Sequence, residues 1–357
     1  MLVEAPVSVI VVNYNGGSLL RRCIGTLADQ TLPPHEIIIV DNGSVDGSID
    51  SLEDLPVMAT GRVRIVTPGS NLGFAAANNL GARAATAPWI ATLNPDAFPE
   101  PEWLAELMAA TLRHPDTAMF GSTQIDAADI ARLDGAGDVY HASGLVWRGH
   151  HGAPAGSLPP EGEVFAPCAA AALYRRDLFL EAGGFDESFF CYCEDVDLGF
   201  RLRLLGHKCV QVAAARVLHV GSAITGRRSA FATYHSTRNR VWMFVKNMPA
   251  ALLLPLLPLH ITLNALLLVR AVLMGEAGTM LRGLRDAVLG LDKVVARRRA
   301  IQARRAVSIS GLATRMDWSL SGLLGRRSRT RPVTPSTVPP AAISPATFTH
   351  PDPSPTG

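Results

Sequence analysis

The chain has 357 residues, of which 48% are hydrophobic and 18% are charged, and its formal net charge is +2. This length allows about two domains with a buried core, and the small net charge argues against nucleic acid as a partner. The five cysteines are odd in number and scattered, so we expect reduced thiols in a cytosolic setting rather than disulfides or a zinc site. The N-terminal residues lack a basic region followed by an apolar core, so no signal peptide is expected.

Composition divides the chain into three zones. Residues 1–225 have the mixed composition of a globular domain, and residues 226–310 are very apolar and then strongly basic. Residues 311–357 are rich in Pro, Ser and Thr and have little to bury. We therefore predict a folded domain, a helical region and a disordered tail, in that order.

The first hundred residues alternate apolar runs with an amphipathic segment. Residues 7–12 and 36–40 are continuous β-branched runs, as in the buried strands of a parallel sheet. Residues 18–27 carry their apolar side chains on one face of a helix, and residues 63–66 and 89–93 predict two further strands. This order indicates a doubly wound α/β domain, a fold that binds ligands outside the carboxyl ends of its strands.

Polar residues follow these strands. Asn13 and Tyr14 come after the first strand, Asp41 after the second, and Asp96 after residues 89–93. Each is weak alone, because turns use Asn and Asp routinely. If the crevice binds a diphosphate, Asp96 would hold Mg²⁺ or Mn²⁺, since both ions prefer oxygen ligands and share them with phosphates.

The middle of the chain predicts two helices, an irregular stretch and two short strands. Residues 71–83 fit both a helix that begins close to a ligand and an ordinary asparagine-capped helix, and residues 102–112 predict the other helix. Residues 122–163 are polar and rich in Gly, His and Pro, so we expect a loop or hairpin region over the site. Residues 209–212 and 217–220 predict the strands.

An acidic cluster opens another predicted helix. Glu194, Asp195 and Asp197 follow an aromatic run, and apolar residues then recur every fourth position to residue 204. Carboxylates at a helix N-terminus are favoured by the backbone N–H groups and the helix dipole. One beside aromatic surface can also be a tuned general base, so both interpretations remain open at this point.

The order of these motifs resembles the family 2 glycosyltransferases with a GT-A fold, and most closely their rhamnosyltransferase-like branch, which builds bacterial surface polysaccharides. The resemblance covers residues 7–225. It implies an α/β nucleotide-diphospho-sugar transferase fold, with a doubly wound mixed sheet and a C-terminal apolar and basic helical region. The motifs that carry it are residues 8–15, 40–48, 71–74, 93–96, 183–187, 194–198 and 219–222.

The resemblance assigns a donor site for a nucleoside-diphosphate sugar, either dTDP- or UDP-linked. Asp41 would recognise the base, the backbone near Asn13 and Tyr14 would line its pocket, and Asn71 and Asn78 would help shape the donor pocket.

The resemblance also implies a divalent metal, Mn²⁺ or Mg²⁺. Asp96 matches the last Asp of the family's metal-binding Asp-x-Asp, whose first position is Asn94 here. His219 matches a metal ligand of some relatives, although a lone His at a strand end is equally well structural.

The Glu194–Asp195 pair matches the family's catalytic acidic pair, and we favour Asp195 as general base with Glu194 as the runner-up. The implied reaction is one inverting displacement by an acceptor hydroxyl, without a nucleophile on the protein.

A charge-free apolar stretch, residues 249–269, is long enough to span a bilayer. Pro255, Pro258, His260 and Asn264 interrupt it, so it is equally well an element that lies on the membrane. Residues 282–305 predict a basic amphipathic helix attracted to anionic lipid. We therefore expect the protein to lie at the cytoplasmic face of the cell membrane, beside a glycan or polyprenyl-linked acceptor. The alternative is a soluble helical subdomain that buries the apolar run.

Two other functions remain open on the sequence alone. A nucleotidyltransferase could use a similar crevice, but it would need a triphosphate-binding loop that is not evident after the first strand. A catalytically inactive membrane-bound scaffold could keep the fold to bind a partner, against which Asp41, Asp96 and Asp195 argue.

Overall fold

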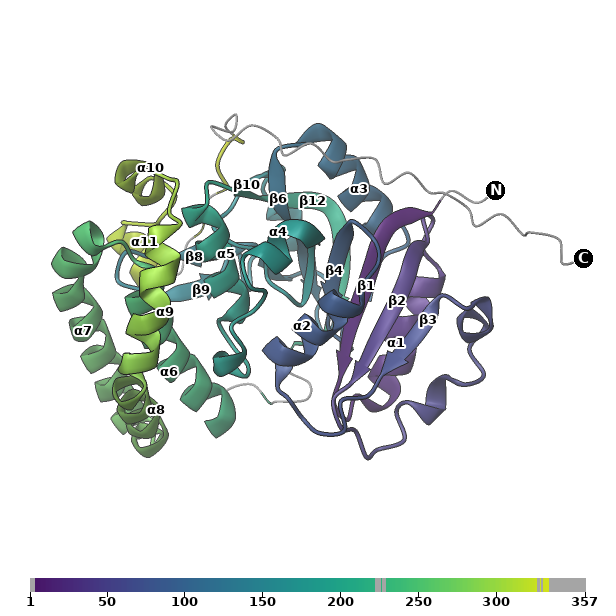
Figure 1. The fold of residues 1–357 in the computed structure, drawn as a ribbon, viewed down its shortest axis with the longest axis horizontal. Coiled ribbons are helices and arrows are strands. Elements are labelled where there is room, and N and C mark those ends of the chain that lie inside the picture. Colours follow the sequence, from purple (N-terminus) through teal and green to yellow (C-terminus); the bar gives the residue numbers. More distant parts are fainter. Residues whose placement is uncertain (1–3, 222–225, 227–228, 326–327, 329, 334–357) are drawn as a thin grey trace, which may run out of the picture.

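The computed structural model describes residues 4–221, 226, 229–325, 328 and 330–333. A large twisted sheet with helices on both faces forms one part of the molecule, and a bundle of helices from the C-terminal region packs against one end of it (Figure 1). The expectations for residues 1–3, for residue 222 of the last motif and for residues 334–357 lie outside this description.

The sheet is mixed, and its central strands run in the order β10-β12-β6-β11-β4-β1-β2-β3. Strands β1 to β4 are mutually parallel neighbours, whereas β11 is antiparallel to both β4 and β6. Strand β5 pairs with β12, and β7 pairs with β6. The ten strands are β1 (Ala5–Asn13), β2 (Pro34–Asp41), β3 (Val63–Val66), β4 (Trp89–Leu93), β5 (Ala97–Pro99), β6 (Thr117–Asp126), β7 (Leu133–Ala136), β10 (Gly162–Glu163), β11 (Ala171–Arg175) and β12 (Lys208–His219).

Alternation along β1 divides the core into two layers. Val7, Val9 and Val11 pack in one cluster with residues of α1 (Gly17–Ala28) and α3 (Trp103–Arg113). Ile10 and Val12 pack in the other cluster with residues of α2 (Phe74–Ala84), α4 (Arg176–Glu181) and α5 (Glu194–Leu204). The predicted doubly wound α/β domain is confirmed, including its strands at residues 63–66 and 89–93.

Two local expectations need correction. The strands predicted at residues 209–212 and 217–220 are one strand, β12, because a register shift between Val212 and Arg216 lets it continue along β6. The stretch 122–163 is only partly the expected loop region, since its first residues belong to β6. Strands β8 (Asp138–Tyr140) and β9 (Val146–Arg148) then form a separate hairpin.

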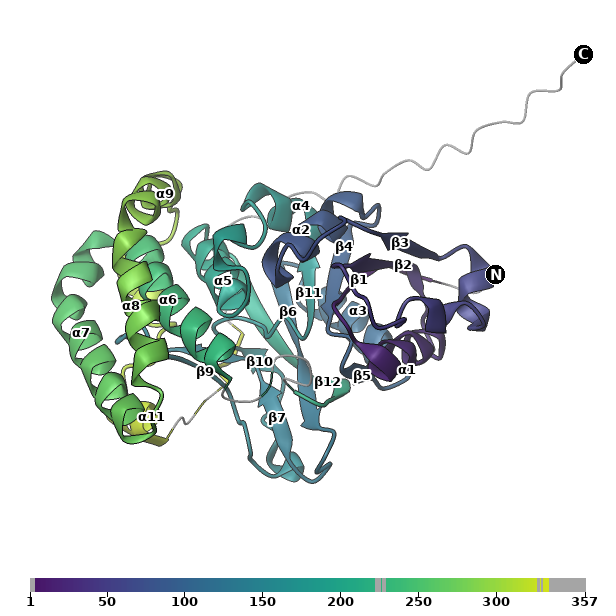
Figure 2. The ribbon, with the colours of Figure 1, turned by 90° about the horizontal axis from the view of Figure 1, so that it is seen from below.

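The C-terminal helices share a core with the sheet domain. Val196 and Phe200 of α5 cluster with Met243 and Phe244 of α6 and with Leu256 of α7. Helix α6 also packs against α8 and α9, so these two helices cover α6 on the side away from α5 (Figure 2). The helices are α6 (Ala230–Asn247), α7 (Ala250–Leu273), α8 (Ala277–Leu289) and α9 (Leu291–Ala303).

The basic helix predicted over residues 282–305 is in fact two helices. The chain breaks at Gly290, where a Cβ atom would lie 2.6 Å from the ring of Trp242. Helix α7 continues through Pro255 and Pro258. Among the described residues, it is the single helix that is long and apolar enough to cross a membrane.

Disorder was expected from residue 311, but the structure has α10 (Ile309–Ala313) and α11 (Leu320–Gly325) there. The backbone N–H of Asp317 donates to the carbonyl of Tyr140 at 2.9 Å, and its carbonyl accepts from Ala142 at 2.8 Å. The expectation failed because this segment forms hydrogen bonds with the β8–β9 hairpin and buries Leu312 and Met316 in the core that α5 and α6 share.

Candidate active site

A cavity of ≈ 750 Å³ opens at the carboxyl ends of β1 and β4. Its walls come from these strand ends, the β8–β9 hairpin, the loop before α5 and the end of β12. The structure thus brings together segments that are far apart in the sequence. The predicted site residues that line it are Tyr14, Asn71, Asp96, Glu194, Asp195 and His219.

Three other predicted residues do not line this cavity. Asn13 is fully buried, and its amide donates to Ser44 at 2.9 Å and to Ser48 at 2.8 Å, which ties the loop after β1 to the loop after β2. Asp41 belongs to this tie, 3.4 Å from the Asn13 amide. Asn78 is buried and donates to a carbonyl of its own helix.

Asn42, which directly follows Asp41 at the same strand end, lines the cavity instead. Its amide donates to the side-chain oxygen of Asn71 at 2.9 Å, so the two asparagines form one polar wall. Two adjacent residues at the end of β2 thus differ in role: Asp41 faces Asn13, whereas Asn42 faces the cavity.

Asp96 and His219 lie next to each other in the cavity wall. Both side chains are buried, and His219 Nε2 lies 3.4 Å from Asp96 Oδ1. The other ring nitrogen, Nδ1, lies 2.6 Å from Oδ2 of Asp134, so Asp134 orients the ring and leaves Nε2 toward Asp96. Burial lowers the pKa of His219, but hydrogen bonds to Asp134 and Asp96 outweigh it and leave the pKa above its ordinary value.

These residues fit a divalent cation. Among the residues that the structure describes, Asn94 Oδ1 is buried at the cavity without a hydrogen-bond partner, and His219 Nε2 lies beside Asp96 Oδ1 at the same cavity. An imidazole nitrogen with carboxylate and amide oxygens is a donor set that Mn²⁺ accepts, and the oxygens alone suit Mg²⁺. Asn94 therefore offers an oxygen at the first position of the motif that ends in Asp96.

The acidic pair opens α5 at the opposite wall. Glu194 is buried, its Oε2 has no hydrogen-bond partner in the described chain, and burial beside Asp195 raises its pKa well above the ordinary value. Asp195 is less buried and accepts from the backbone N–H of Ala169 at 3.0 Å and of Val196 at 2.8 Å. Burial raises the pKa of Asp195, and the two N–H groups and Arg148 partly oppose this. Asp195 is thus the more accessible carboxylate and the better fixed one.

Sequence reasoning missed the contribution of the β8–β9 hairpin. Asp138 and Arg148, which are paired across the hairpin, both line the cavity, as does Trp147, whose buried Nε1 has no partner in the described chain. Arg148 forms an ion pair with Asp134. The only available signal was alternation over three residues in each strand, which is too short to predict a strand or a direction for its side chains.

A second group of ligand atoms lies close by. One such atom each from Asp138, Cys168 and Asp195 lie within 4.8 Å of one another. The positive charge of Arg148 acts on all three groups, which opposes a cation there. Asp96 and His219 therefore fit a cation better than this group does.

Comparison with known proteins identifies this arrangement. Residues 8–183 match the family model "Glycosyl transferase family 2". The chain is 32% identical over 254 residues to the N-acetylglucosaminyl-diphospho-decaprenol L-rhamnosyltransferase of Mycobacterium tuberculosis, covering 64% of this chain and 81% of that protein. The chain belongs to the family 2 glycosyltransferases.

Solved structures agree on the GT-A fold. Residues 1–349 of S. aureus TarS superpose with a TM-score of 0.54 at 15% identity, covering 90% of this chain and 93% of that one. GalNAc-T7, crystallised with UDP, GalNAc and Mn²⁺, superposes with a TM-score of 0.55 at 18% identity, and the match covers 69% of this transferase and 48% of that longer chain. The predicted fold and family are confirmed.

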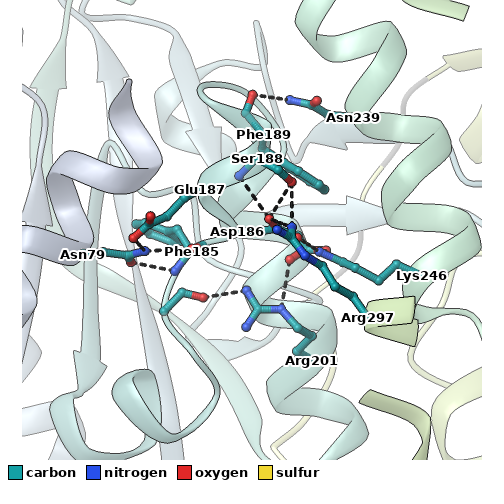
Figure 3. Close-up of polar contacts among 12 residues, drawn as sticks. Asn79, Phe185, Asp186, Glu187, Ser188, Phe189, Arg201, Asn239, Lys246 and Arg297 are labelled. Atoms are coloured by element: carbon teal, nitrogen blue, oxygen red, sulfur yellow. Dashed lines mark hydrogen bonds and ion pairs between the residues drawn. The ribbon is translucent and has the colours of Figure 1, made fainter. Parts of the chain in front are cut away.

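The loop that presents the acidic pair of this transferase is strained and clamped. Phe190, Tyr192 and Cys193 have positive φ angles of 65°, 72° and 68°, which side-chain-bearing residues rarely adopt. The amide of Asn239 on α6 reaches the carbonyls of Phe189, Cys191 and Tyr192 at 3.0, 2.9 and 2.8 Å. Helix α6 therefore holds the catalytic loop in place, and Figure 3 shows Asn239 at the Phe189 carbonyl.

The third acid of the cluster, Asp197, has a structural role. It is fully buried and accepts from Lys246 at 2.8 Å and from Asn247 at 2.7 Å, both on α6, and from Arg201 at 2.9 Å. Lys246 also pairs with Asp186 (Figure 3).

Arg297 on α9 completes this network by pairing with Asp186. A smaller cavity of ≈ 450 Å³ lies between α9 and residues 181–187, and the charged side chains named here at its wall are already paired. We therefore place the active site in the larger cavity.

Proposed function

We propose that the chain is an inverting, metal-dependent hexosyltransferase that moves a sugar from a nucleoside-diphosphate donor to a hydroxyl of a polyprenyl-diphosphate-linked glycan. The observation that carries this proposal is that Asp195 lines the same cavity as Asp96 and His219, although the three come from different parts of the chain. A transferase needs this combination, because one group must accept the acceptor's proton while others stabilise the departing diphosphate.

The donor would enter over Tyr14 and the Asn42–Asn71 wall, with its diphosphate toward Asp96. A divalent cation held by Asp96 and His219 would supply positive charge to the leaving diphosphate. Asp134 keeps the His219 ring oriented for that task.

Asp195 would take the proton of the acceptor hydroxyl. Its two backbone N–H contacts fix the carboxylate, and its raised pKa makes it a stronger base than an ordinary aspartate. The acceptor oxygen forms the new bond to the anomeric carbon as the bond to the diphosphate breaks, so one displacement inverts that carbon. Glu194 is the second candidate, but it is more deeply buried.

The acceptor and sugar follow from the relatives. The mycobacterial relative is named as an L-rhamnosyltransferase acting on a diphospho-decaprenol-linked N-acetylglucosamine, which supports rhamnose as the sugar and a lipid-linked acceptor, with dTDP or UDP as the nucleotide of the donor. A role in bacterial cell-wall or surface-polysaccharide biosynthesis at the cytoplasmic face of the membrane is the corresponding proposal, and the O-antigen biosynthesis protein RfbC of Myxococcus xanthus, 31% identical over 233 residues, is consistent with it.

Thermal unfolding with dTDP, UDP and GDP, each with and without Mn²⁺ or Mg²⁺, tests the donor class. A ligand that binds only the folded state stabilises it by about 2.7 kcal/mol at a hundredfold excess over its dissociation constant. We expect a base-selective stabilisation that needs the metal. A nucleotidyltransferase would instead release pyrophosphate from a nucleoside triphosphate, and an inactive scaffold would respond to no nucleotide. Either result would overturn the proposal.

A further inference from the structure

Helix α7 has two faces of different character. Leu256, His260, Leu263 and Asn264 are buried and lie on one face, spaced by three or four residues. The opposite face is apolar and exposed, and its side chains include Leu254 at 70%, Ile261 at 60%, Val269 at 59% and Val272 at 60% of their full exposure. An apolar helix that simply crossed a membrane alone would have no reason to turn its two polar side chains toward the catalytic domain.

The buried face is fastened to the catalytic domain by polar contacts. The Nδ1–H of His260 donates to the carbonyl of Ser143 at 2.7 Å, and its ring stacks on Phe244 of α6 at 4.0 Å. Asn264 accepts from Arg240 of α6 at 2.7 Å. Ser143 lies in the turn of the β8–β9 hairpin, which also supplies cavity residues, and a Cβ atom at the neighbouring Gly144 would lie 2.7 Å from the His260 ring.

These contacts bear on whether α7 can span a bilayer. If α7 left the domain to cross the hydrocarbon core, Arg240 would lose its partner Asn264, and His260 would lose its carbonyl. The docked helix lies along the outer edge of the bundle, on the side away from the sheet, in both views (Figures 1 and 2). It is therefore held in a position from which it can lie on a membrane but not cross it.

Charge indicates what covers the exposed face. Residues 270–305 contain nine basic residues and three acidic ones. Arg297, Arg298 and Arg304 contact the protein itself, through Asp186, the backbone of α6 and its end, and Glu181. Other basic residues of α7, α8 and α9 are exposed, and they include Arg270, Arg282, Lys293, Arg299 and Arg285, of which the last pairs with its neighbour Asp286.

An anionic bilayer surface complements both features, because apolar side chains enter the headgroup boundary while Lys and Arg stay with the lipid phosphates. A second copy of the chain on this face would bring the same basic residues together, which opposes a symmetric dimer.

We propose that α7 lies in the plane of an anionic membrane surface while it remains docked on the catalytic domain, and that it does not span the bilayer. This inference rests on the proposed membrane location and is independent of the proposed transfer reaction. It means that the membrane contact and the catalytic hairpin are parts of one rigid arrangement through His260 and Ser143.

The test is flotation of the full chain with vesicles of neutral lipid alone or with about one third anionic lipid. The test variant replaces three exposed residues of α7, Ile261→Gln, Val269→Gln and Val272→Gln. The control variant replaces three exposed apolar residues of the catalytic domain, Val45→Gln, Leu112→Gln and Ile130→Gln. We expect binding to anionic vesicles that the control keeps and the test variant loses by roughly a hundredfold, since each half-exposed side chain contributes about a factor of five.

Further measurements keep the outcomes distinct. We expect alkaline carbonate to release the bound chain, whereas resistance to carbonate would show a spanning helix and overturn the proposal. Absence of vesicle binding, or equal loss in the control, would also overturn it, as would a dimer in sedimentation that only the α7 variant dissociates. Nucleotide-dependent thermal stabilisation, measured without vesicles on both variants, reports on the folded state and on the donor site, so a failed transferase proposal would be recognised separately.

Discussion

The clamp between Asn239 and the catalytic loop leads to a prediction in which activity and stability separate. Asn239→Ala removes an amide that reaches three carbonyls of residues 189–192. An amide has two N–H groups, each worth about 1 kcal/mol net in a folded protein, so the loss is about 2 kcal/mol. This loss is partly offset, because three residues of the loop have positive φ angles that each cost about 1 kcal/mol. A released loop can relieve that strain.

The net effect on stability should therefore be below about 2 kcal/mol, or roughly 3 °C in melting temperature for a chain of this length. The effect on kcat should be far larger. The loop leads directly into Glu194 and Asp195, and a displacement of about 1 Å at a reacting group can cost about a hundredfold. We expect kcat to fall about a hundredfold, with nucleotide binding retained because the Asn42–Asn71 wall is held by a hydrogen bond of its own.

The assay is initial-rate transfer of a labelled sugar, alongside thermal unfolding of the same preparations. Gln302→Ala is the matched control, because its amide donates at 2.8 Å to the carbonyl of Asn247, away from the catalytic loop. It should lose about 1 kcal/mol of stability and keep its activity. Equal activity losses in the two variants, or full activity of Asn239→Ala, would refute the idea that α6 positions the catalytic loop.

Three further predictions concern charged side chains. Lys246→Met removes the buried ammonium that Asp186 and Asp197 share, although Arg297 and Arg201 stay beside them. It should cost about 3 kcal/mol in urea unfolding at pH 7, and a loss below about 1 kcal/mol would contradict the network. Burial alone would raise the pKa of Asp186, but Lys246 outweighs it and holds the pKa below the ordinary 3.8, so this contribution is present above that pH and is lost as the pH falls below it. Arg148→Met should shift the acidic limb of the kcat/KM profile to higher pH, because Arg148 lowers the pKa of the proposed base Asp195. Arg148→Lys keeps the positive charge and should shift the limb less. An unchanged limb in the Met variant would exclude Asp195 as the titrating group. Asp96→Asn should remove the Mn²⁺ dependence of nucleotide-induced thermal stabilisation, and an unaltered dependence would place the metal elsewhere.

The sheet was predictable because its signal is local. Strands such as residues 89–93 are continuous apolar runs, and the polar residues that follow them must meet at one edge of a parallel sheet. That reasoning located Asp96 and the cavity. It could not separate Asp41 from Asn42, because adjacent residues after a strand point in different directions and the sequence does not say which one faces the ligand.

Long-range contributions were not predictable. Asp134 orients His219 across 85 positions, and Asn239 clamps carbonyls some 50 residues away, so no local pattern marks either one. The length and polarity of residues 122–163 predicted a loop or hairpin region over the site, but not that the hairpin places Arg148 at the cavity. The helical region was expected to bind membrane, but its second task, fixing the catalytic loop, depends on packing that appears only in the fold.

The most direct test of the central claim is transfer by Asp195→Asn, assayed with the nucleotide sugar that stabilises the protein and with polyprenyl-diphosphate-linked N-acetylglucosamine as acceptor. Glu194→Gln is measured in parallel, since it alters the adjacent acid. The account predicts that Asp195→Asn loses about 10²–10⁴ in kcat and still binds the nucleotide diphosphate with metal, while Glu194→Gln loses less. Full activity of Asp195→Asn, or a larger loss in Glu194→Gln, would contradict the assignment of Asp195 as the general base.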